Sequence, residues 1–328
     1  MASTGSRATA ALAAALLASL AGAQTLQWIG QTFDGAAVTL WTLTDAGAPG
    51  AKLGTVSLPA GSSVGSDLFR CMPYGSHCQF IYVDNVGGAS VLINVTLDAQ
   101  VVGKTILPPA DNIVSLHVDH STDTSFFTAL TGPGEAAVMS VANNGRRATT
   151  VVDLSPFLAA SGASATIKTG GATHCSNLQT MWVAVSNLSA GAILTVDLPT
   201  GRVTKSTPLA FPGFDALWAD CAEFDVQNDV PGGTVFDEAN QVLRYGIVGD
   251  GGAFVPQATG KVGGGLVPSG LLTFANVFDT KFNYAAPLYP PGAKPGDTVK
   301  GSIAFFDFDG PGMTFSPVDY FLAGASLS

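Results

Sequence analysis

The sequence predicts an all-β chain folded as a β-propeller with six four-stranded antiparallel blades. Three observations lead to this fold class. Hydrophobic residues make up 47% of the 328 residues, yet they occur in short runs broken by Gly, Pro and Asp. Such runs pair into hairpin patterns that recur along the chain, and each chain end carries one further strand pattern. Short apolar runs between turn residues are typical of strands in stacked sheets.

The recurring unit has two parts. The outer part is an alternating strand, a turn with Gly or Asp, and a second strand rich in Val and Thr. It begins at Ala36, Ser90, Ala136, Ala192, Gly233 and Gly301. The inner part is a strand, a polar turn and another strand, beginning at Ser66, Asp111, Ala163, Asp215 and Ser269. Together they make a four-stranded unit of roughly 40 to 65 residues, which is the period of propeller blades.

The chain ends predict how the ring closes. The segment QTLQWIGQTF from Gln24 supplies a strand that no inner strand precedes, and VDYFLAG from Val318 is a spare strand. We expect the C-terminal strand to complete the first blade, since a closed ring leaves only short edges. Seven blades are the alternative, because GAFVPQATGKVGGGLVPSG from Gly252 has room for two more strands. A two-sheet sandwich or a tandem of two β domains would also fit an all-β composition.

One blade resembles a known repeat. The run VAVSNLSAGAILTVDLPTGRVTKSTPL (Val183 to Leu209) is similar to YVTN-type and NHL-type propeller repeats. The matching residues are Val183, Ala184, Asn187, Val196, Asp197, Thr200, Gly201 and Val203. The resemblance implies the propeller fold, with Asp197 and Gly201 in a turn and the valines in the core. It implies no catalytic residue.

The N-terminal residues predict export. Arg7 precedes an apolar stretch from about Ala8 to Leu20, which closes on Ala21-Gly22-Ala23. This pattern predicts a cleaved signal peptide over residues 1–23 and a single propeller domain over 24–328, because the apolar run is too short to span a bilayer. An alanine-rich helix and an organelle transit peptide are the alternatives. We expect a protein that is secreted or held in the lumen of the secretory or vacuolar pathway, without a membrane span.

Cysteines and sequons fit that compartment. Cys71 and Cys78 flank the turn-rich MPYGSH, so a disulfide between them is expected, and Cys175 and Cys221 pair by elimination. The alternative is a zinc site at the two His-Cys dipeptides. Asn94 and Asn187 begin glycosylation sequons.

The charge balance excludes some partners. The formal net charge is −10, and the densest basic spot is Arg146-Arg147. Nucleic acid is therefore not an expected partner, because its phosphates must be neutralised by cations.

Three places carry residues suited to chemistry. Asp67, Asn112 (beside Asp111) and Asp215 each stand where an inner strand is expected to begin, so they would ring one mouth of a central channel. Their oxygens suit Ca²⁺, and in outline this resembles the six-bladed calcium-dependent lactonases and related esterases. The alternative is that they only form turns.

The second and third places are polar stretches. In HVDHSTD, the residues His117, Asp119 and Asp123 are expected to share a side, with His120 in the turn, and a His-Asp pair there would suit a general base. In FDFDG, Asp307 and Asp309 share a strand face. Each stretch has a solvated turn as its alternative.

We therefore expect a secreted binding or interaction scaffold whose ligand, a protein, glycan or small molecule, sits on one face of the ring. The first alternative is a calcium-assisted hydrolase of lactones, esters or glycans. The second is an acidic matrix or coat protein.

Overall fold

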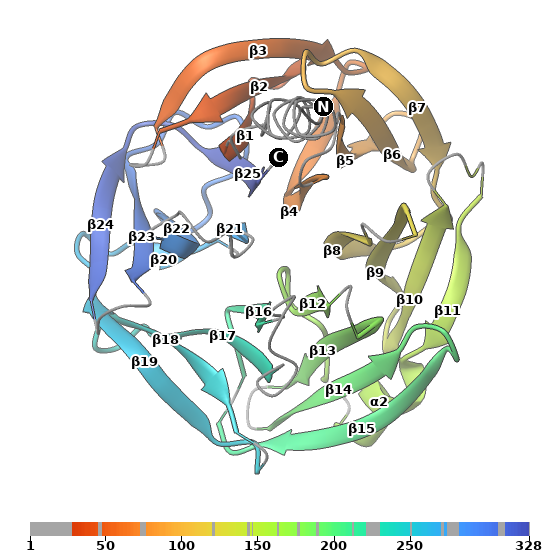
Figure 1. Cartoon of the computed structure of the whole chain (residues 1–328), viewed down its shortest axis with the longest axis vertical. Coiled ribbons are helices and arrows are strands. Elements are labelled where there is room, and N and C mark those ends of the chain that lie inside the picture. The colour runs from red at the N-terminus through yellow and green to blue at the C-terminus, as the bar shows by residue number, and fades with distance from the viewer. Residues whose placement is uncertain are drawn as a thin grey trace, which may run out of the picture.

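The computed structural model forms a closed ring of sheets around a central axis (Figure 1). It describes residues 28–44, 48–72, 77–119, 122–142, 145, 147–162, 164–175, 178–187, 190–211, 213–220, 230–249, 251–269, 272–273, 282–307 and 312–327. These residues form six antiparallel sheets, which we number as blades one to six in chain order. The predicted six-bladed propeller is confirmed, and the seven-blade and sandwich alternatives are wrong.

In each of the first three blades, four strands follow one another from the axis outward. Blade one consists of β25 (Leu322–Leu327), β1 (Trp28–Phe33), β2 (Ala37–Leu43) and β3 (Pro49–Ser57). Blade two consists of β4 (Ser62–Cys71), β5 (His77–Asp84), β6 (Ala89–Thr96) and β7 (Val101–Ile106). Blade three consists of β8 (Asn112–Asp119), β9 (Thr124–Gly132), β10 (Glu135–Ala142) and β11 (Thr149–Asp153).

The last three blades follow the same order. Blade four consists of β12 (Ala172–Cys175), β13 (Thr180–Ser186), β14 (Gly191–Asp197) and β15 (Arg202–Leu209). Blade five consists of β16 (Ala216–Asp220), β17 (Val230–Asp237), β18 (Val242–Val248) and β19 (Phe254–Lys261). Blade six consists of β20 (Val267–Pro268) and β21 (Leu272–Thr273) on the inner edge, then β22 (Phe282–Tyr289), β23 (Gly301–Asp307) and β24 (Met313–Val318).

The C-terminal strand closes the ring, as predicted. β25 pairs antiparallel with β1, from Trp28 opposite Leu327 to Thr32 opposite Leu322. The strand begins at Leu322 rather than at Val318, because Val318 is still the last residue of β24 and pairs with Gly301. Blade one is thus built from the first three described strands of the chain together with the last one.

The assignment of strands in blade five was wrong by one strand. The hairpin that begins at Gly233 forms β17 and β18, the second and third strands, not the outer pair. The segment from Gly252 then supplies β19, the outer strand of blade five, and β20, on the inner edge of blade six. A hairpin of the second and third strands has the same alternation and turn residues as a hairpin of the third and fourth strands. Only the pairing of β17 with β16 shows which of the two this hairpin is. The strand expected within residues 221–229 lies outside the described residues.

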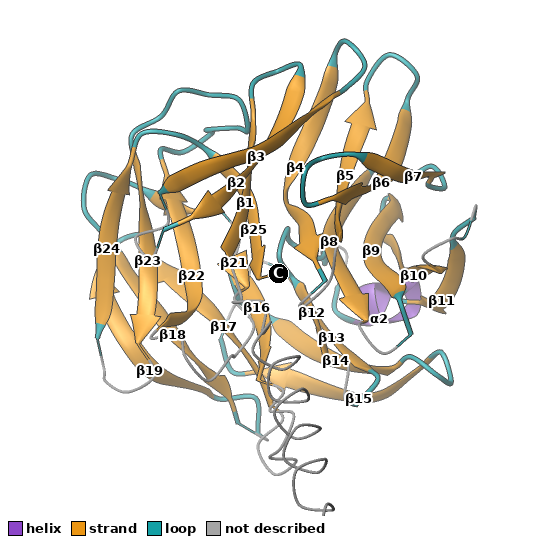
Figure 2. Cartoon of the chain, turned by 45° about the horizontal axis from the view of Figure 1, so that its top comes forward, coloured by secondary structure: helices purple, strands orange, loops and turns teal. Residues whose placement is uncertain are grey.

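Within the described residues, one helix interrupts the all-β pattern. α2 (Ser155–Ala160) follows β11, with Pro156 in its first turn, and buries Leu158 against the apolar residues between blades three and four. In Figure 2 it lies beside β10 and β11. No helix in the described ranges has the length and apolar character needed to cross a membrane.

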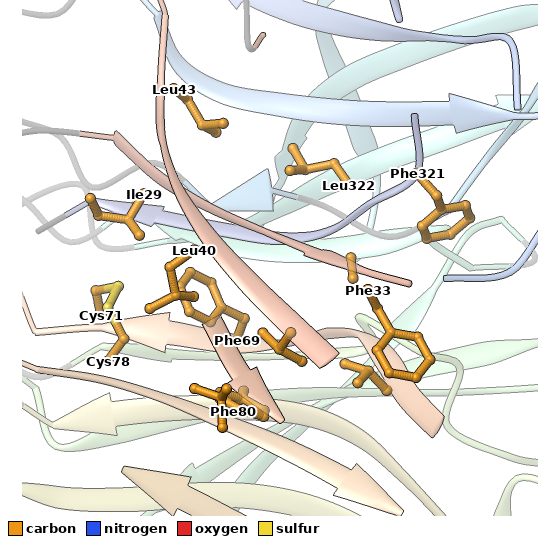
Figure 3. Packing of buried hydrophobic residues seen from close by; sticks show 14 of the residues in the cluster. Ile29, Phe33, Leu40, Leu43, Phe69, Cys71, Cys78, Phe80, Phe321 and Leu322 are labelled. Carbon is orange, nitrogen blue, oxygen red and sulfur yellow. A yellow bond between two sulfur atoms is a disulfide. The ribbon is translucent and has the colours of Figure 1, made fainter. Parts of the chain in front are cut away.

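The core lies between neighbouring blades rather than inside one of them. The cluster joining blades six, one and two includes Ile29 and Phe33 of β1, Phe69 of β4 and Phe321, the residue before β25 (Figure 3). Because side chains alternate along each strand, every blade packs one face against each neighbour. The predicted disulfide between Cys71 and Cys78 is present in this cluster and joins β4 to β5.

Candidate functional site

The inner strands give the ring two distinct faces. We call the face where they begin the start face; Asn112 of β8 and Ala216 of β16 lie there. We call the face where they end the end face; Cys71 of β4 and Asp119 of β8 lie there.

The start face holds two of the three predicted metal or ligand residues. Asn112 is the exposed first residue of β8, and Asp215 is partly buried directly before β16. The loop ahead of β12 lies between these two strands. Its Gly170 donates its N–H to the Val114 carbonyl over 2.8 Å and accepts from the Leu217 N–H over 2.8 Å. One loop therefore ties together the inner strands that follow Asn112 and Asp215.

Asp67 lies elsewhere. β4 begins at Ser62, so Asp67 lies inside the strand and its expected position ahead of an inner strand was wrong. The ladder between β4 and β5 shifts register between Val64 and Phe69. Because of this irregularity, the residues before Asp67 do not show the alternation expected of a strand, and the sequence pattern places the start of β4 too late. The side chain of Asp67 lies outside the described residues, so its role as a ligand stays a prediction.

Asp215 has an unusual electrostatic environment. Burial raises the pKa of its carboxyl to about 6, although Lys168 and the Phe236 N–H act to lower it. Carboxyls that titrate near neutral pH are enriched at functional sites. Among the described residues, however, no three His, Cys, Asp or Glu side chains are grouped so that they could hold a metal ion.

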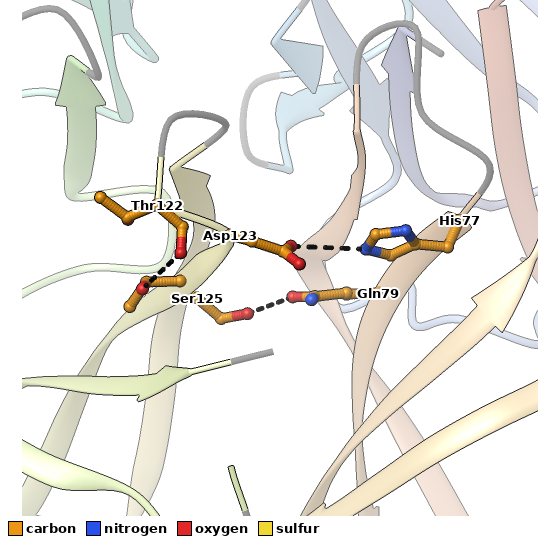
Figure 4. Close-up of polar contacts among 6 residues, drawn as sticks. His77, Gln79, Thr122, Asp123 and Ser125 are labelled. Carbon is orange, nitrogen blue, oxygen red and sulfur yellow. Dashed lines mark hydrogen bonds and ion pairs between the residues drawn. The ribbon is translucent and has the colours of Figure 1, made fainter. Parts of the chain in front are cut away.

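The end face carries a larger polar arrangement, on both sides of blade three. At the seam of blades two and three, His77 Nε2 lies 3.9 Å from Asp123 Oδ1, and the Ser125 hydroxyl donates to Gln79 Oε1 (Figure 4). The side chains of His77 and Asp123 are 18% and 44% exposed, so this seam reaches the surface. Arg70 of β4 stands directly opposite Gln79 in the ladder and is buried.

The seam of blades three and four continues the arrangement. Asp119 is 0% exposed, and its Oδ2 accepts hydrogen bonds from Thr122 Oγ1 at 2.7 Å and from Gln179 Nε2 at 2.8 Å. His117 Nε2 lies 3.0 Å from the Ala172 carbonyl of β12, and the His117 and His174 ring centroids are 6.4 Å apart. We call the side chains of these two seams the end-face cluster. They are Arg70, His77, Gln79, His117, Asp119, Thr122, Asp123, Ser125, His174 and Gln179.

His117 is neutral in this setting. Burial holds the pKa of its imidazole well below the usual range, and Arg70 and His174 act in the same direction. Since the Ala172 carbonyl can only accept, the neutral ring carries its proton on Nε2.

The stretch HVDHSTD is therefore split between two seams. His117 and Asp119 alternate on one face of β8 and contact blade four, whereas Asp123 contacts His77 of blade two. The expected common side for all three was wrong. Asp123 has a left-handed backbone (φ 51°) in the turn, which breaks the strand alternation that the prediction assumed. His120 lies outside the described residues.

Sequence patterns indicated five members of the end-face cluster: His117, Asp119 and Asp123 in the polar stretch, and His77 and His174 in the two His-Cys dipeptides of the zinc alternative. The rest belong to segments that are separate in sequence, such as β4 for Arg70 and the turn before β13 for Gln179. His77 and His174 each stand directly before a cysteine and next to the polar turn of an inner hairpin.

The remaining predicted sites are placed as follows. Cys78 is bonded to Cys71, and Cys175 is also in a disulfide, so the zinc alternative was wrong because neither sulfur is available as a thiolate ligand. Cys221, the expected partner of Cys175, lies outside the described residues. Asp307 ends β23, and Asp309 lies outside the described residues.

Neither sequon asparagine has a fully exposed side chain. Asn94 of β6 is 7% exposed. Asn187 is partly buried, and its Nδ2 donates to the Ser161 carbonyl over 2.6 Å. Glycosylation at either position stays a prediction, and it requires modification before these side chains are packed.

Comparison with known proteins agrees with the fold. The β-propeller domain of Myceliophteria thermophila Cps50 (Swd1) matches with a TM-score of 0.52 and 11% identity, over 87% of this chain and 80% of that one. A chain of a nidogen/laminin complex matches with a TM-score of 0.50 and 12% identity, over 92% and 98%. No family model and no curated protein matches the sequence. At these identities the likeness concerns the fold alone.

Proposed function

We propose that the chain is an exported binding scaffold whose ligand lies on the end face, over blades two to four. The observation that supports this proposal is the convergence of the end-face cluster from three consecutive blades. A few convergent polar groups beside apolar surface are typical of ligand sites. Here Thr122 is exposed, His77 and Asp123 are partly exposed, and Leu178, the residue before Gln179, is an apolar side chain that is 38% exposed.

The cluster suits a polar ligand such as a glycan or a peptide. It presents acceptor oxygens on the Thr122 hydroxyl and the Asp123 carboxylate and an amide on Gln179, all from turns rather than from strand interiors. Turns held by a rigid scaffold are where binding residues concentrate. Gln79 adds a buried Nε2 that has no hydrogen-bond partner within the described ranges.

A binding screen with matched variants tests the proposal. Glycans, peptides and divalent cations are first screened by thermal shift. The affinity of each hit is then measured by calorimetry for the parent chain, for Asp123→Ala and Gln179→Ala, and for the start-face control Asp111→Ala. We expect each end-face variant to weaken binding about 10-fold, as for one lost hydrogen bond to a charged or buried group. A hit that is weakened only by Asp111→Ala would place the ligand on the start face and overturn the proposal.

Export is tested separately. The disulfide between Cys71 and Cys78 is compatible with an oxidising compartment. We expect the secreted product to begin at Gln24 when its N-terminus is sequenced. Retention of the intact chain in the cytosol would contradict export without bearing on the ligand site.

A calcium-assisted hydrolase acting at the start face is the second candidate, favoured by the raised pKa of Asp215. It predicts that Ca²⁺ raises the melting temperature, that lactones or esters are cleaved, and that Asp215→Ala abolishes both effects. Asp297→Ala, an exposed turn residue, serves as the control. Absence of a calcium shift in the intact chain would leave Asp215 without this role.

A further inference from the structure

The two seams of blade three differ in what an added proton would do. At the seam with blade two, His77 faces the carboxylate of Asp123, so a protonated His77 would form an ion pair. At the seam with blade four, His117 faces a backbone carbonyl and cation-forming groups instead. Acid would therefore weaken the seam with blade four.

Among the described side chains, the surroundings of His117 are short of negative charge. β4 contributes Arg70 and also carries Asp67, whose side chain lies outside the described residues. β12 contributes His174, whose ring centroid lies 6.4 Å away. Its partner strand β9, Thr124–Gly132, carries no titratable side chain. On β8 itself the nearest carboxylate is Asp119, whose Oδ2 already accepts from Thr122 and Gln179.

We propose that protonation of His117 loosens the contact between β8 and β12, so that the ring opens between blades three and four under mildly acidic conditions. The added charge would be buried beside Arg70, and a buried charge without a counter-charge is strongly unfavourable. The Nε2–H bond to Ala172 survives protonation, but the new proton on Nδ1 needs an acceptor.

The free energy of opening depends on pH because the open and closed forms bind different numbers of protons. Burial keeps the pKa of His117 below its ordinary value of about 6.5, so the open form binds more protons than the closed form. The stabilisation by neutral His117 is complete above about pH 7 and decreases as the pH falls through 6.5. For one such group, opening increases about eightfold between pH 7.0 and pH 5.5.

Hydrogen exchange on the intact, oxidised chain tests the proposal without any ligand, so its outcome is separate from that of the proposed function. After correction for intrinsic rates, we expect exchange in β8 and β12 to rise about eightfold from pH 7.0 to 5.5. Exchange in β5 and β6 of blade two should change little. The variant His117→Gln keeps a donor for Ala172 but cannot be protonated, and it should remove the increase, whereas His77→Gln should leave it in place.

Histidine NMR keeps the proposal testable if His117→Gln fails to fold. The chain has four histidines, so selective ¹⁵N labelling resolves each ring. We expect the His117 ring to stay in its Nε2–H tautomer down to the pH at which β8 and β12 lose protection. Loss of protection that is uniform over all blades, or that precedes any change at His117, would overturn the proposal.

Discussion

The carboxylate of Asp197 shows what several aspartates of this chain do. It accepts from the Thr200 N–H at 2.8 Å and from the Thr200 hydroxyl at 2.7 Å, which closes the turn between β14 and β15. The Thr200 hydroxyl, followed by its N–H, lowers the pKa of Asp197. Asp34 and Asp237 hold their turns in the same way. Such aspartates stabilise their own turn, and this role does not depend on the rest of the fold.

Asp215 differs because its surroundings disfavour its charge. The raised pKa of about 6 means that the folded state holds a proton that the unfolded state releases near pH 4. Its contribution to stability is therefore present at low pH and lost as the pH rises from about 4 to 6.

We expect Asp215→Asn to be more stable than the parent chain at pH 7 by about 1–3 kcal/mol, and equal to it near pH 4. Asn keeps an acceptor for the Phe236 N–H but carries no charge. Urea denaturation across this pH range measures the difference. A constant offset at every pH would show that packing, not ionisation, is responsible.

Gly252 lies where the backbone of blade five comes close to the backbone of blade four. It has φ +77°, and a Cβ atom there would lie 1.7 Å from the Pro208 carbonyl oxygen of β15. Gly252→Ala should lower the free energy of unfolding by about 3 kcal/mol, because both strain and a backbone clash arise. Gly265→Ala is the matched control, with φ +69° and nothing within 4 Å, and should cost only about 1 kcal/mol. Equal losses measured by urea denaturation would contradict the close contact.

At the scale of the element, the hairpin of β4 and β5 combines a covalent link with an irregular strand. The disulfide joins the last residue of β4 to the second residue of β5, where Cys71 and Cys78 are directly paired. Farther along, the register shifts between Val64 and Phe69. The disulfide therefore fixes the register at the end face, beside His77.

Cys71→Ala combined with Cys78→Ala should lower stability by about 2–3 kcal/mol, as expected for a short loop of sequence separation 7. Alanine avoids placing a hydroxyl in the apolar cluster. Thermal unfolding measures the loss, and hydrogen exchange should show it first in β4 and β5. An unchanged melting temperature would mean that pairing alone holds this hairpin.

At the scale of the whole molecule, one strand decides whether the ring is closed. β25 pairs with β1 and also packs beside β4, while the Leu322 N–H donates to the Tyr289 hydroxyl of blade six over 2.8 Å. Leu322 and Ala323 are buried. This strand thus joins blades six, one and two at once.

Removing residues 322–328 should abolish cooperative thermal unfolding, because blade one loses its inner strand and the core cluster that joins three blades becomes exposed. A synthetic peptide of residues 318–328 should restore near-UV circular dichroism when added in trans. Removal of Ser328 alone is the control and should have no effect. A truncated chain with the original melting temperature would show that closure contributes little.

The candidate site could be predicted only in part, for a reason that His77 and Asp123 make clear. HVDHSTD was recognisable as a polar stretch from its letters. Its partners His77 and Gln179 are far away in sequence, and nothing in either segment indicates which blades become neighbours. The pairing of His77 with Asp123 also depends on a left-handed turn that alternation cannot show.

The sequence by itself determined the features that depend on near neighbours. Alternation specified strands, Asp and Gly specified turns such as Asp197 to Gly201, and a short spacing specified the bridge of Cys71 and Cys78. The tertiary structure alone decided which hairpin of blade five is outer, where β4 begins and which polar residues meet at the end face. These depend on contacts between blades, whose energy comes from burial between surfaces that no local pattern of residues encodes.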